Sequence, residues 1–286
     1  MSDGNPLIDI GELSKPATVL VEKVCNAIGI IYEPTRMRRA AKAEVEIERI
    51  KAIGRLELSS LEERAIGRLL KQEARKQETI ESITLEAASQ LPRDSNPIEL
   101  DADWIVHFFR SCEIVTNAEM KSLWARILAG EAANPSSFSK RTLDFVASMS
   151  RYDAAQFTTL CRFVWDIDGP TPLIHDPSTD VLKRAGLTFS ALTHLNSIGL
   201  ITFDGISGFT IRDRSDRFVA KYFGKPILVE LPVERKSVLY VGMVLLTSIG
   251  MELYSVCEAT NYDAHFHEAV EQWKTRGYTI KEIENT

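Results

Sequence analysis

The strongest constraint on the fold is a stretch from residue 35 to residue 91 that contains no proline. It is dense in Ala, Glu, Lys, Arg, Leu and Ile, which lose little side-chain entropy in a helix. Small and apolar residues recur there at intervals of three, four or seven, which places them on one helix face: Ile47, Ile50, Gly54, Leu61, Ala65 and Leu69. The pattern predicts a long charged helical arm over residues 36–92, of the coiled-coil kind.

Two glycines interrupt this arm, Gly54 and Gly67. Each costs about 1 kcal/mol in a helix interior relative to alanine. Close approach of a second helix is one reason for a sequence to tolerate that cost, because glycine has no side chain to hold two helices apart. We therefore expect the N-terminal helices to associate, and a homo-oligomer is the predicted assembly.

The arm also differs in charge from the rest of the chain. The whole chain has a formal net charge of −6, yet twelve basic and only seven acidic residues lie between Arg36 and Lys76. A solvated helix face is the simplest interpretation, and binding of nucleic acid or of an anionic lipid surface is the alternative. Arg36, Arg38 and Arg39 are the candidate anion-binding residues at the start of the arm.

Residues 93–168 are predicted to form a helical bundle. A linker with two prolines, residues 92–103, is followed by a capping box in "TNAE" (116–119), a helix expected to stop at Gly130, and a further helix in "SKRTLDFVASM". "SRYD" (150–153) has the spacing of another capping box. Lys140 and Arg141 lie in a first turn where the helix dipole favours acids, so this basic pair is a candidate anion site.

Residues 169–286 are predicted to form a winged-helix-like α+β domain that ends in a C-terminal helix. Two short helices run into "GLITF", with strands expected around a Gly205–Gly208 turn as a hairpin wing. The candidate nucleic-acid contacts are basic: Lys183, Arg184, Arg212 and Arg214. The second helix, "TFSALTHLNSI", contains no Lys or Arg, whereas DNA affinity depends on neutralising phosphates. Contact with protein is therefore favoured over contact with DNA.

A search for catalytic chemistry gives no complete constellation. Asp103 and His107 are four residues apart on one helix face, but no nucleophile accompanies them, so a structural histidine is the favoured interpretation. His265 and His267 would point to different faces of a helix, which argues against a metal site. "HDPS", which begins at His175, has the composition of a polar turn. There is no P-loop and no GxGxxG motif. We expect no enzyme activity, no cofactor and no metal.

The remaining segment, residues 1–35, is predicted to contain an amphipathic helix. The start is acidic and has no apolar core of the signal-peptide kind. The four cysteines form no CxxC pair, so reduced thiols in a cytoplasmic protein are expected. Contact of residues 17–31 with a membrane surface is an alternative, because the segment is apolar although too short to span a bilayer.

Five motifs together resemble bacterial domain-of-unknown-function family 2806: "LSKPATVLVEKVCNAIG", "RAAKAE", "DWIVHFF", "LWARILAGE" and "FSKRTLDFV". The order of "LWARILAGEAANP", "LDFVASMSRYDA" and "LTHLNSIGLI" is similar, more loosely, to the Abi-alpha (abortive infection alpha) family, whose members are associated with defence against phage. The resemblance implies a mainly α fold with a smaller α+β part, and a sensor or effector component of anti-phage defence. The alternatives are a nucleic-acid-binding regulator and a membrane-surface abortive-infection effector.

Overall fold

The structure is a computed structural model that describes residues 13–29, 60–212, 215–232 and 238–283. The chain divides into two units, Met1–Ala147 and Ser148–Thr286. The four-part division predicted from the sequence stays a prediction. Within the described residues, no helix has both the length and the apolar character that are needed to cross a bilayer.

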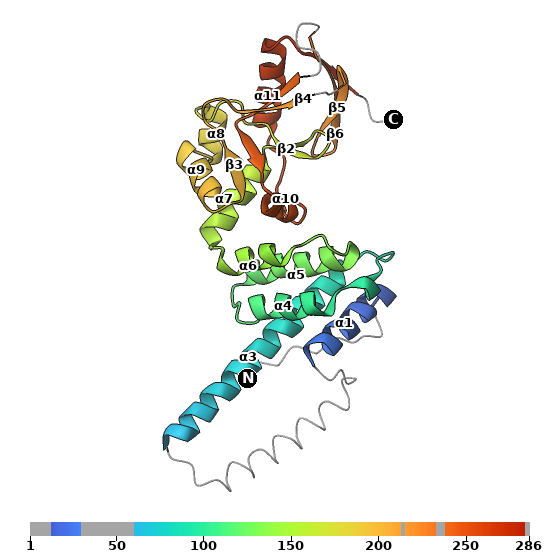
Figure 1. Cartoon of the computed structure of the whole chain (residues 1–286), viewed down its shortest axis with the longest axis vertical. Helices are drawn as coiled ribbons and strands as arrows, with labels where there is room; N and C mark the ends of the chain where they lie inside the picture. Colours follow the sequence, from blue (N-terminus) through green and yellow to red (C-terminus); the bar gives the residue numbers. More distant parts are fainter. Residues whose placement is uncertain (1–12, 30–59, 213–214, 233–237, 284–286) are drawn as a thin grey trace. The chain divides into compact units, whose positions relative to one another are not determined.

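The first unit is helical throughout its described part (Figure 1). Helix α3 packs against α5 and α1, and α1 also packs against α4. The elements are α1 (Lys15–Ile28), α3 (Ser60–Gln90), the 3₁₀ helix η2 (Pro97–Glu99), α4 (Ala102–Cys112), α5 (Ala118–Ala133) and α6 (Lys140–Ser148). The apolar residues of α1 are buried inside this unit: Ala17, Leu20, Val21, Val24 and Cys25.

Aromatic side chains join α4 to α5 and to the turn before α6. The Trp104 ring stacks on Phe108 with a centroid distance of 5.1 Å, and Phe108 meets Trp124 edge to face at 5.2 Å. The indole N–H of Trp104 donates to the backbone oxygen of Phe138 at 2.7 Å. Because these rings are buried and offset, they contribute both apolar burial and a fixed geometry to the core.

Helix α5 differs from its prediction at both ends. It begins with Asn117 as N-cap, whose side chain accepts from the Met120 N–H, rather than with a Thr116 capping box. It continues past Gly130 to Ala133, because Gly130 does not adopt the positive φ of a helix-stopping glycine. The predicted capping residue was therefore wrong by one residue and the predicted stop by three, while the helix begins at Ala118 as its sequence predicted.

Glu131 explains where α5 does end. Glu131 is only 3% exposed, and its carboxylate accepts from the backbone N–H groups of Ser136 at 2.7 Å and of Phe138 at 2.8 Å. These bonds hold the turn after Asn134, in which Ser136 has φ of 70°. Charge-assisted bonds to backbone N–H groups offset the cost of burying the carboxylate.

The second unit combines helices with antiparallel sheets. Its helices are α7 (Arg151–Cys161), α8 (Asp180–Ala185), α9 (Phe189–Ser197), α10 (Ser248–Tyr254) and α11 (Asp263–Thr275). Its strands are β1 (Val164–Asp166), β2 (Pro170–Pro172), β3 (Ile201–Phe203), β4 (Phe209–Arg212), β5 (Arg217–Tyr222), β6 (Lys225–Glu230), β7 (Val238–Gly242), β8 (Val244–Leu246) and β9 (Thr279–Glu282). The predicted mainly α fold with a smaller β-containing part is confirmed.

The strands after α9 do not form the predicted hairpin around Gly205–Gly208. Strand β3 pairs with β8 and β4 pairs with β7, both antiparallel. Between them the Asp204 N–H donates to the Met243 oxygen, while the Asp204 carboxylate accepts from the N–H groups of Ile206 and Ser207. The segment between β3 and β4 is thus a bulge, because both strands pair along the consecutive strands β7 and β8. It does not reverse the chain.

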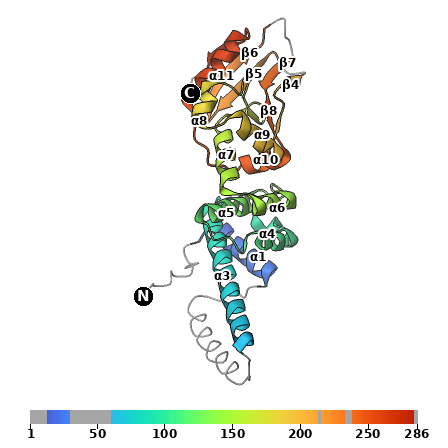
Figure 2. The ribbon, with the colours of Figure 1, turned by 90° about the vertical axis from the view of Figure 1, so that its left-hand side faces the viewer.

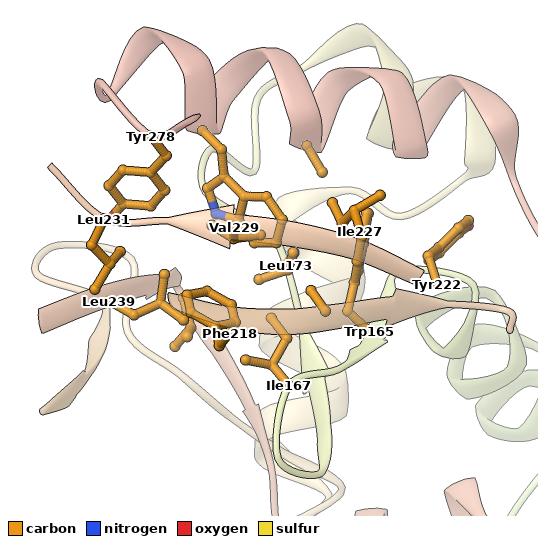
Figure 3. Close-up of a cluster of buried hydrophobic side chains, with 14 of the residues drawn as sticks. Trp165, Ile167, Leu173, Phe218, Tyr222, Ile227, Val229, Leu231, Leu239 and Tyr278 are labelled. Atoms are coloured by element: carbon orange, nitrogen blue, oxygen red, sulfur yellow. The ribbon is translucent and has the colours of Figure 1, made fainter. Parts of the chain in front are cut away.

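The core of the second unit lies between α11 and one face of a five-stranded sheet of order β2-β1-β5-β6-β9 (Figure 3). The alternating exposure of β5 places Phe218, Ala220 and Tyr222 on this inner face. Trp165 stacks on Phe266 of α11 with a centroid distance of 5.5 Å. Burial of this cluster, together with the sheet hydrogen bonds, fixes α11 on the sheet.

Candidate functional site

Helix α3 is covered over its C-terminal half only. Ile83 and Ala87 are fully buried there, whereas Leu61 and Leu69 are 67% and 55% exposed. Figures 1 and 2 show the N-terminal half extending beyond α4 and α5. Residues four apart lie in line on a helix, so Leu61, Ala65 and Leu69 form one row of exposed small and apolar side chains. We term this row the exposed α3 stripe.

Side-chain contacts anchor the covered half of α3. The Thr79 hydroxyl donates to the Val115 oxygen at 3.3 Å, and the Ser122 hydroxyl donates to the Glu86 carboxylate at 2.6 Å. Lys76 Nζ lies 3.0 Å from a carboxylate oxygen of Glu113. The stripe therefore belongs to a helix whose other end is fixed in a packed unit.

Gly67 does not belong to the stripe. It is two residues from Ala65, which is about 200° around the helix. No atom lies within 4 Å of the position that a Cβ would take at Gly67. The close helix approach predicted for this glycine is therefore not made within the described chain, and Gly54 lies outside the described residues.

The predicted anion-binding residues do not form one surface. Lys140 and Arg141 are exposed on the first turn of α6 in the first unit. Lys183 and Arg184 are exposed on the last turn of α8 in the second unit, with Lys183 3.8 Å from Asp180. Arg212 is exposed at the end of β4. The others lie outside the described residues: Arg36, Arg38, Arg39 and Arg214.

The exposed face of α9 is partly apolar. Phe189 is 59% exposed and meets the Phe203 ring edge to face, with a centroid distance of 5.3 Å. Ile206, in the bulge that follows β3, is 93% exposed. Its polar groups are used locally, since the Thr193 hydroxyl donates to the Phe189 oxygen and the Asn196 side chain accepts from the Phe203 N–H. A face of this kind suits contact with protein better than hydrogen bonding to base edges.

His107 joins two helices of the first unit. Its Nε2 lies 2.7 Å from an Asp144 carboxylate oxygen of α6, so its partner is Asp144 and not the predicted Asp103. His107 is therefore hydrogen-bonded, as expected, but to a different partner, and its structural role stays a prediction. Sequence spacing suggests partners only within one helix, whereas here the bond runs between α4 and α6.

A second carboxylate–histidine pair links α7 to α9. Asp153 accepts from the Ser150 N–H and hydroxyl in the predicted capping box, and its other oxygen lies 2.6 Å from His194 Nε2. In a hydrolase triad the histidine stands between the hydroxyl and the carboxylate. Here the carboxylate stands between the other two, so the cluster caps a helix and cannot activate Ser150.

Two histidines are buried in the second unit, which the sequence did not indicate for His175. It is 7% exposed beside Tyr240, and neither ring nitrogen has a hydrogen-bond partner of normal geometry. His265 is 1% exposed and its Nε2 accepts from the Trp165 indole at 3.1 Å. Burial lowers the pKa of His175 to about 4 and that of His265 to about 3. Both rings are neutral at pH 7.

Metal ligation finds no support in the described part of the chain. No group of three or more His, Cys, Asp and Glu side chains is arranged there to hold an ion. His265 is buried while His267 is exposed, as the helical spacing predicted. Asp176 forms the predicted polar turn, since its carboxylate accepts from the Ser178 N–H and hydroxyl.

The sequence also gave no signal for an open cavity of about 680 Å³ on the outer face of the five-stranded sheet. Its charged lining is mixed: Asp166, Asp168, Arg217 and Lys221. Arg217 is already held by Glu230 at 2.9 Å. Side chains of both signs around an open surface select no ligand class.

Comparison with known proteins identifies the family but no activity. The family model "Protein of unknown function (DUF2806)" matches residues 63–271, which is most of the chain. The chain belongs to the DUF2806 family. No curated protein and no solved structure matches it. The matched region starts on the exposed half of α3 and extends into α11.

Proposed function

We propose that this DUF2806 protein is a non-enzymatic interaction protein that self-associates through α3. The observation that carries the proposal is the exposed α3 stripe, in which two leucines remain more than half exposed. Exposed apolar rows on an anchored helix are typical of surfaces that bind another helix. The occupant proposed is a second copy of the same chain.

The stripe is complementary to itself when two α3 helices run antiparallel. A two-fold axis through Ala65 places Leu61 of one copy opposite Leu69 of the other, and small side chains meet at the axis. The same axis places Glu62 opposite Arg68, which are both exposed and opposite in charge. Ion pairs of this type select orientation more than they add affinity.

The expected affinity is modest. Full burial of one leucine side chain contributes about 1.5–3 kcal/mol, and the dimer would cover two from each copy. Association itself costs about 4–15 kcal/mol. At the favourable end, four buried leucines less the smallest association cost leave about 8 kcal/mol, so micromolar dissociation is the tightest that the stripe alone allows, and stronger association would need residues beyond α3.

Sedimentation of the full chain at 1–100 μM, taken as roughly the range of a modest interface, tests the proposal. The wild type should change from monomer toward dimer, and Leu61→Glu with Leu69→Glu should remain monomeric. Ile114→Glu is the matched control, because Ile114 is 74% exposed in the same unit but lies off the stripe. A wild type that is monomeric throughout would overturn self-association.

The resemblance to abortive-infection proteins supports a biological setting. We propose that the protein is a sensor or effector component of bacterial anti-phage defence. Phage should form plaques less efficiently on cells that carry the intact coding sequence than on cells that carry the Leu61→Glu, Leu69→Glu variant. Equal plating across a broad phage panel would remove this role and leave the interaction proposal standing.

A second candidate function rests on the helices of the second unit. We propose that α7, α8, α9 and the ribbon of β3 with β8 form a winged-helix-like module that binds nucleic acid. Lys183 and Arg184 are exposed directly before α9, where they could contact phosphates. Duplex binding should weaken steeply with salt and should fall further in a Lys183→Ala, Arg184→Ala variant. Absence of binding at low salt would exclude it.

A further inference from the structure

Two cysteines that are far apart in the sequence meet in the second unit. Cys161 is the last residue of α7, and Cys257 lies three residues after the end of α10. The two thiols are hydrogen-bonding neighbours. Cys257 Sγ also lies 3.7 Å from the Thr158 hydroxyl, one turn before Cys161 on α7. The loop after α10 thus lies against the C-terminal turn of α7, where the Thr158 hydroxyl and the Cys161 thiol are both neighbours of Cys257.

The exposure of the two thiols differs. Cys161 is fully buried, whereas Cys257 is only partly buried. Cys25 and Cys112 are both buried in the other unit. The pair therefore combines one partly exposed cysteine with a buried cysteine beside it, as an attacking and a resolving thiol require.

We infer that Cys161 and Cys257 form a peroxide-sensitive dithiol that closes to an intramolecular disulfide. The Cys257 thiolate attacks one oxygen of hydrogen peroxide, the O–O bond breaks, and hydroxide leaves and takes up a proton as water. Cys257 is then a sulfenic acid. The Cys161 thiolate attacks that sulfur, the S–O bond breaks, and a second water leaves. Two thiols and one peroxide give one disulfide and two waters.

The surroundings set the rate of this reaction. Burial raises the pKa of the Cys161 thiol well above its ordinary value, and the neighbouring Cys257 raises it further. The thiolate is the reactive form, so closure should be slow at neutral pH and faster as the pH rises. The dithiol is therefore suited to sustained oxidation rather than to rapid peroxide turnover.

Closure would tie α7 to the chain between α10 and α11. The bond would span 95 intervening residues of the sequence, and cross-links that close long loops restrict the unfolded chain most. It would also fix α7, on which α9 rests through the pair of Asp153 and His194. The inference is independent of self-association through α3.

Mass analysis of the oxidised full chain tests the inference. The reduced protein is treated with hydrogen peroxide or, separately, with diamide, then unfolded and alkylated. Two of the four thiols should resist alkylation, and a digest should yield the peptide with Cys161 joined to the peptide with Cys257. Cys257→Ser should abolish this cross-link, while Cys25→Ser, the matched control, should retain it. The oxidised form should melt several degrees higher, and dithiothreitol should reverse the shift.

Three results would overturn the inference. In the first, all four thiols remain open to alkylation after both oxidants. In the second, Cys257 proceeds to the sulfinic acid while Cys161 stays a thiol. In the third, the new disulfide joins two chains rather than two residues of one chain. The wild-type protein alone decides among these, so a variant that fails to fold leaves the test intact.

Discussion

The first unit exposes apolar side chains, whereas the second unit buries polar ones. The first unit satisfies its buried carboxylate, Glu131, with two backbone donors, yet it leaves Leu61 and Leu69 largely in solvent. The second unit buries His175 with neither ring nitrogen in a hydrogen bond of normal geometry. The uncovered apolar side chains are the basis of the proposed contact through α3. Buried neutral histidines indicate a unit whose stability falls as the pH falls.

The largest expected difference between the units is acid sensitivity. The pKa values of His175 and His265 lie below 6.5 in the folded chain, at about 4 and about 3, so the unfolded chain binds their protons first as the pH falls. Their stabilisation is complete above pH 6.5 and is lost progressively below it. At pH 5 the loss is roughly 2 kcal/mol for each histidine. Hydrogen exchange at pH 7 and pH 5 should show it in the second unit only.

Two variants check that the histidines cause this effect. His175→Phe should remove about half of the pH dependence, whereas His267→Gln, at an exposed position on α11, should leave it unchanged. The only histidine of the first unit, His107, is bonded to Asp144 and partly exposed. Equal acid sensitivity of the two units would break the comparison.

The next effect contrasts the two halves of α3. Ile83→Ala removes a fully buried side chain and should lower the free energy of unfolding of the first unit by about 3 kcal/mol. Leu69→Ala should change it by less than about 0.5 kcal/mol when measured below the dimer concentration. Urea unfolding followed by circular dichroism measures both. Similar losses would mean that Leu69 is covered within its own chain.

Glu131→Gln tests the satisfied polar group of the first unit. The amide keeps one acceptor oxygen but presents an N–H group to the other backbone donor, so we expect a loss of roughly 2 kcal/mol. Glu99→Gln, at an exposed position of the same unit, is the control and should be neutral. A neutral result at Glu131 would show that the turn after Asn134 holds without it.

Gly67→Ala has the smallest expected effect. Open space surrounds the new methyl group, so α3 should gain up to about 1 kcal/mol from helix propensity. Because Gly67 lies away from the exposed α3 stripe, the dimerisation constant should not change. Sedimentation of this variant beside the wild type measures the dimerisation constant. Weakened association would show that the contact lies on the other face of α3.

Local signals in the sequence predicted the helices well. The capping box at Ser150 was correctly placed, because a capping side chain bonds to an N–H only three residues away. Partners distant in the sequence were missed. Strand β3 pairs with β8 more than 40 residues later, where no turn residue marks the pairing.

The candidate site was predicted only in part. The apolar period along α3 identified Leu61, Ala65 and Leu69 as one face, but a period does not show whether anything covers that face. The burial of His175 was hidden because "HDPS" has the composition of a turn, while Tyr240, which packs on it, lies on a strand about 65 residues away. Contacts of this kind depend on topology rather than on composition.

Cysteine cross-linking at Ala65 tests self-association most directly. Two cysteines face each other at a two-fold axis, whereas residue 61 of the two copies would lie about 12 Å apart, from a 1.5 Å rise per residue. Ala65→Cys should therefore give covalent dimers on mild oxidation, and Leu61→Cys and the wild type should not. Dimers from Leu61→Cys as readily as from Ala65→Cys, or from neither variant, would contradict the antiparallel α3 dimer.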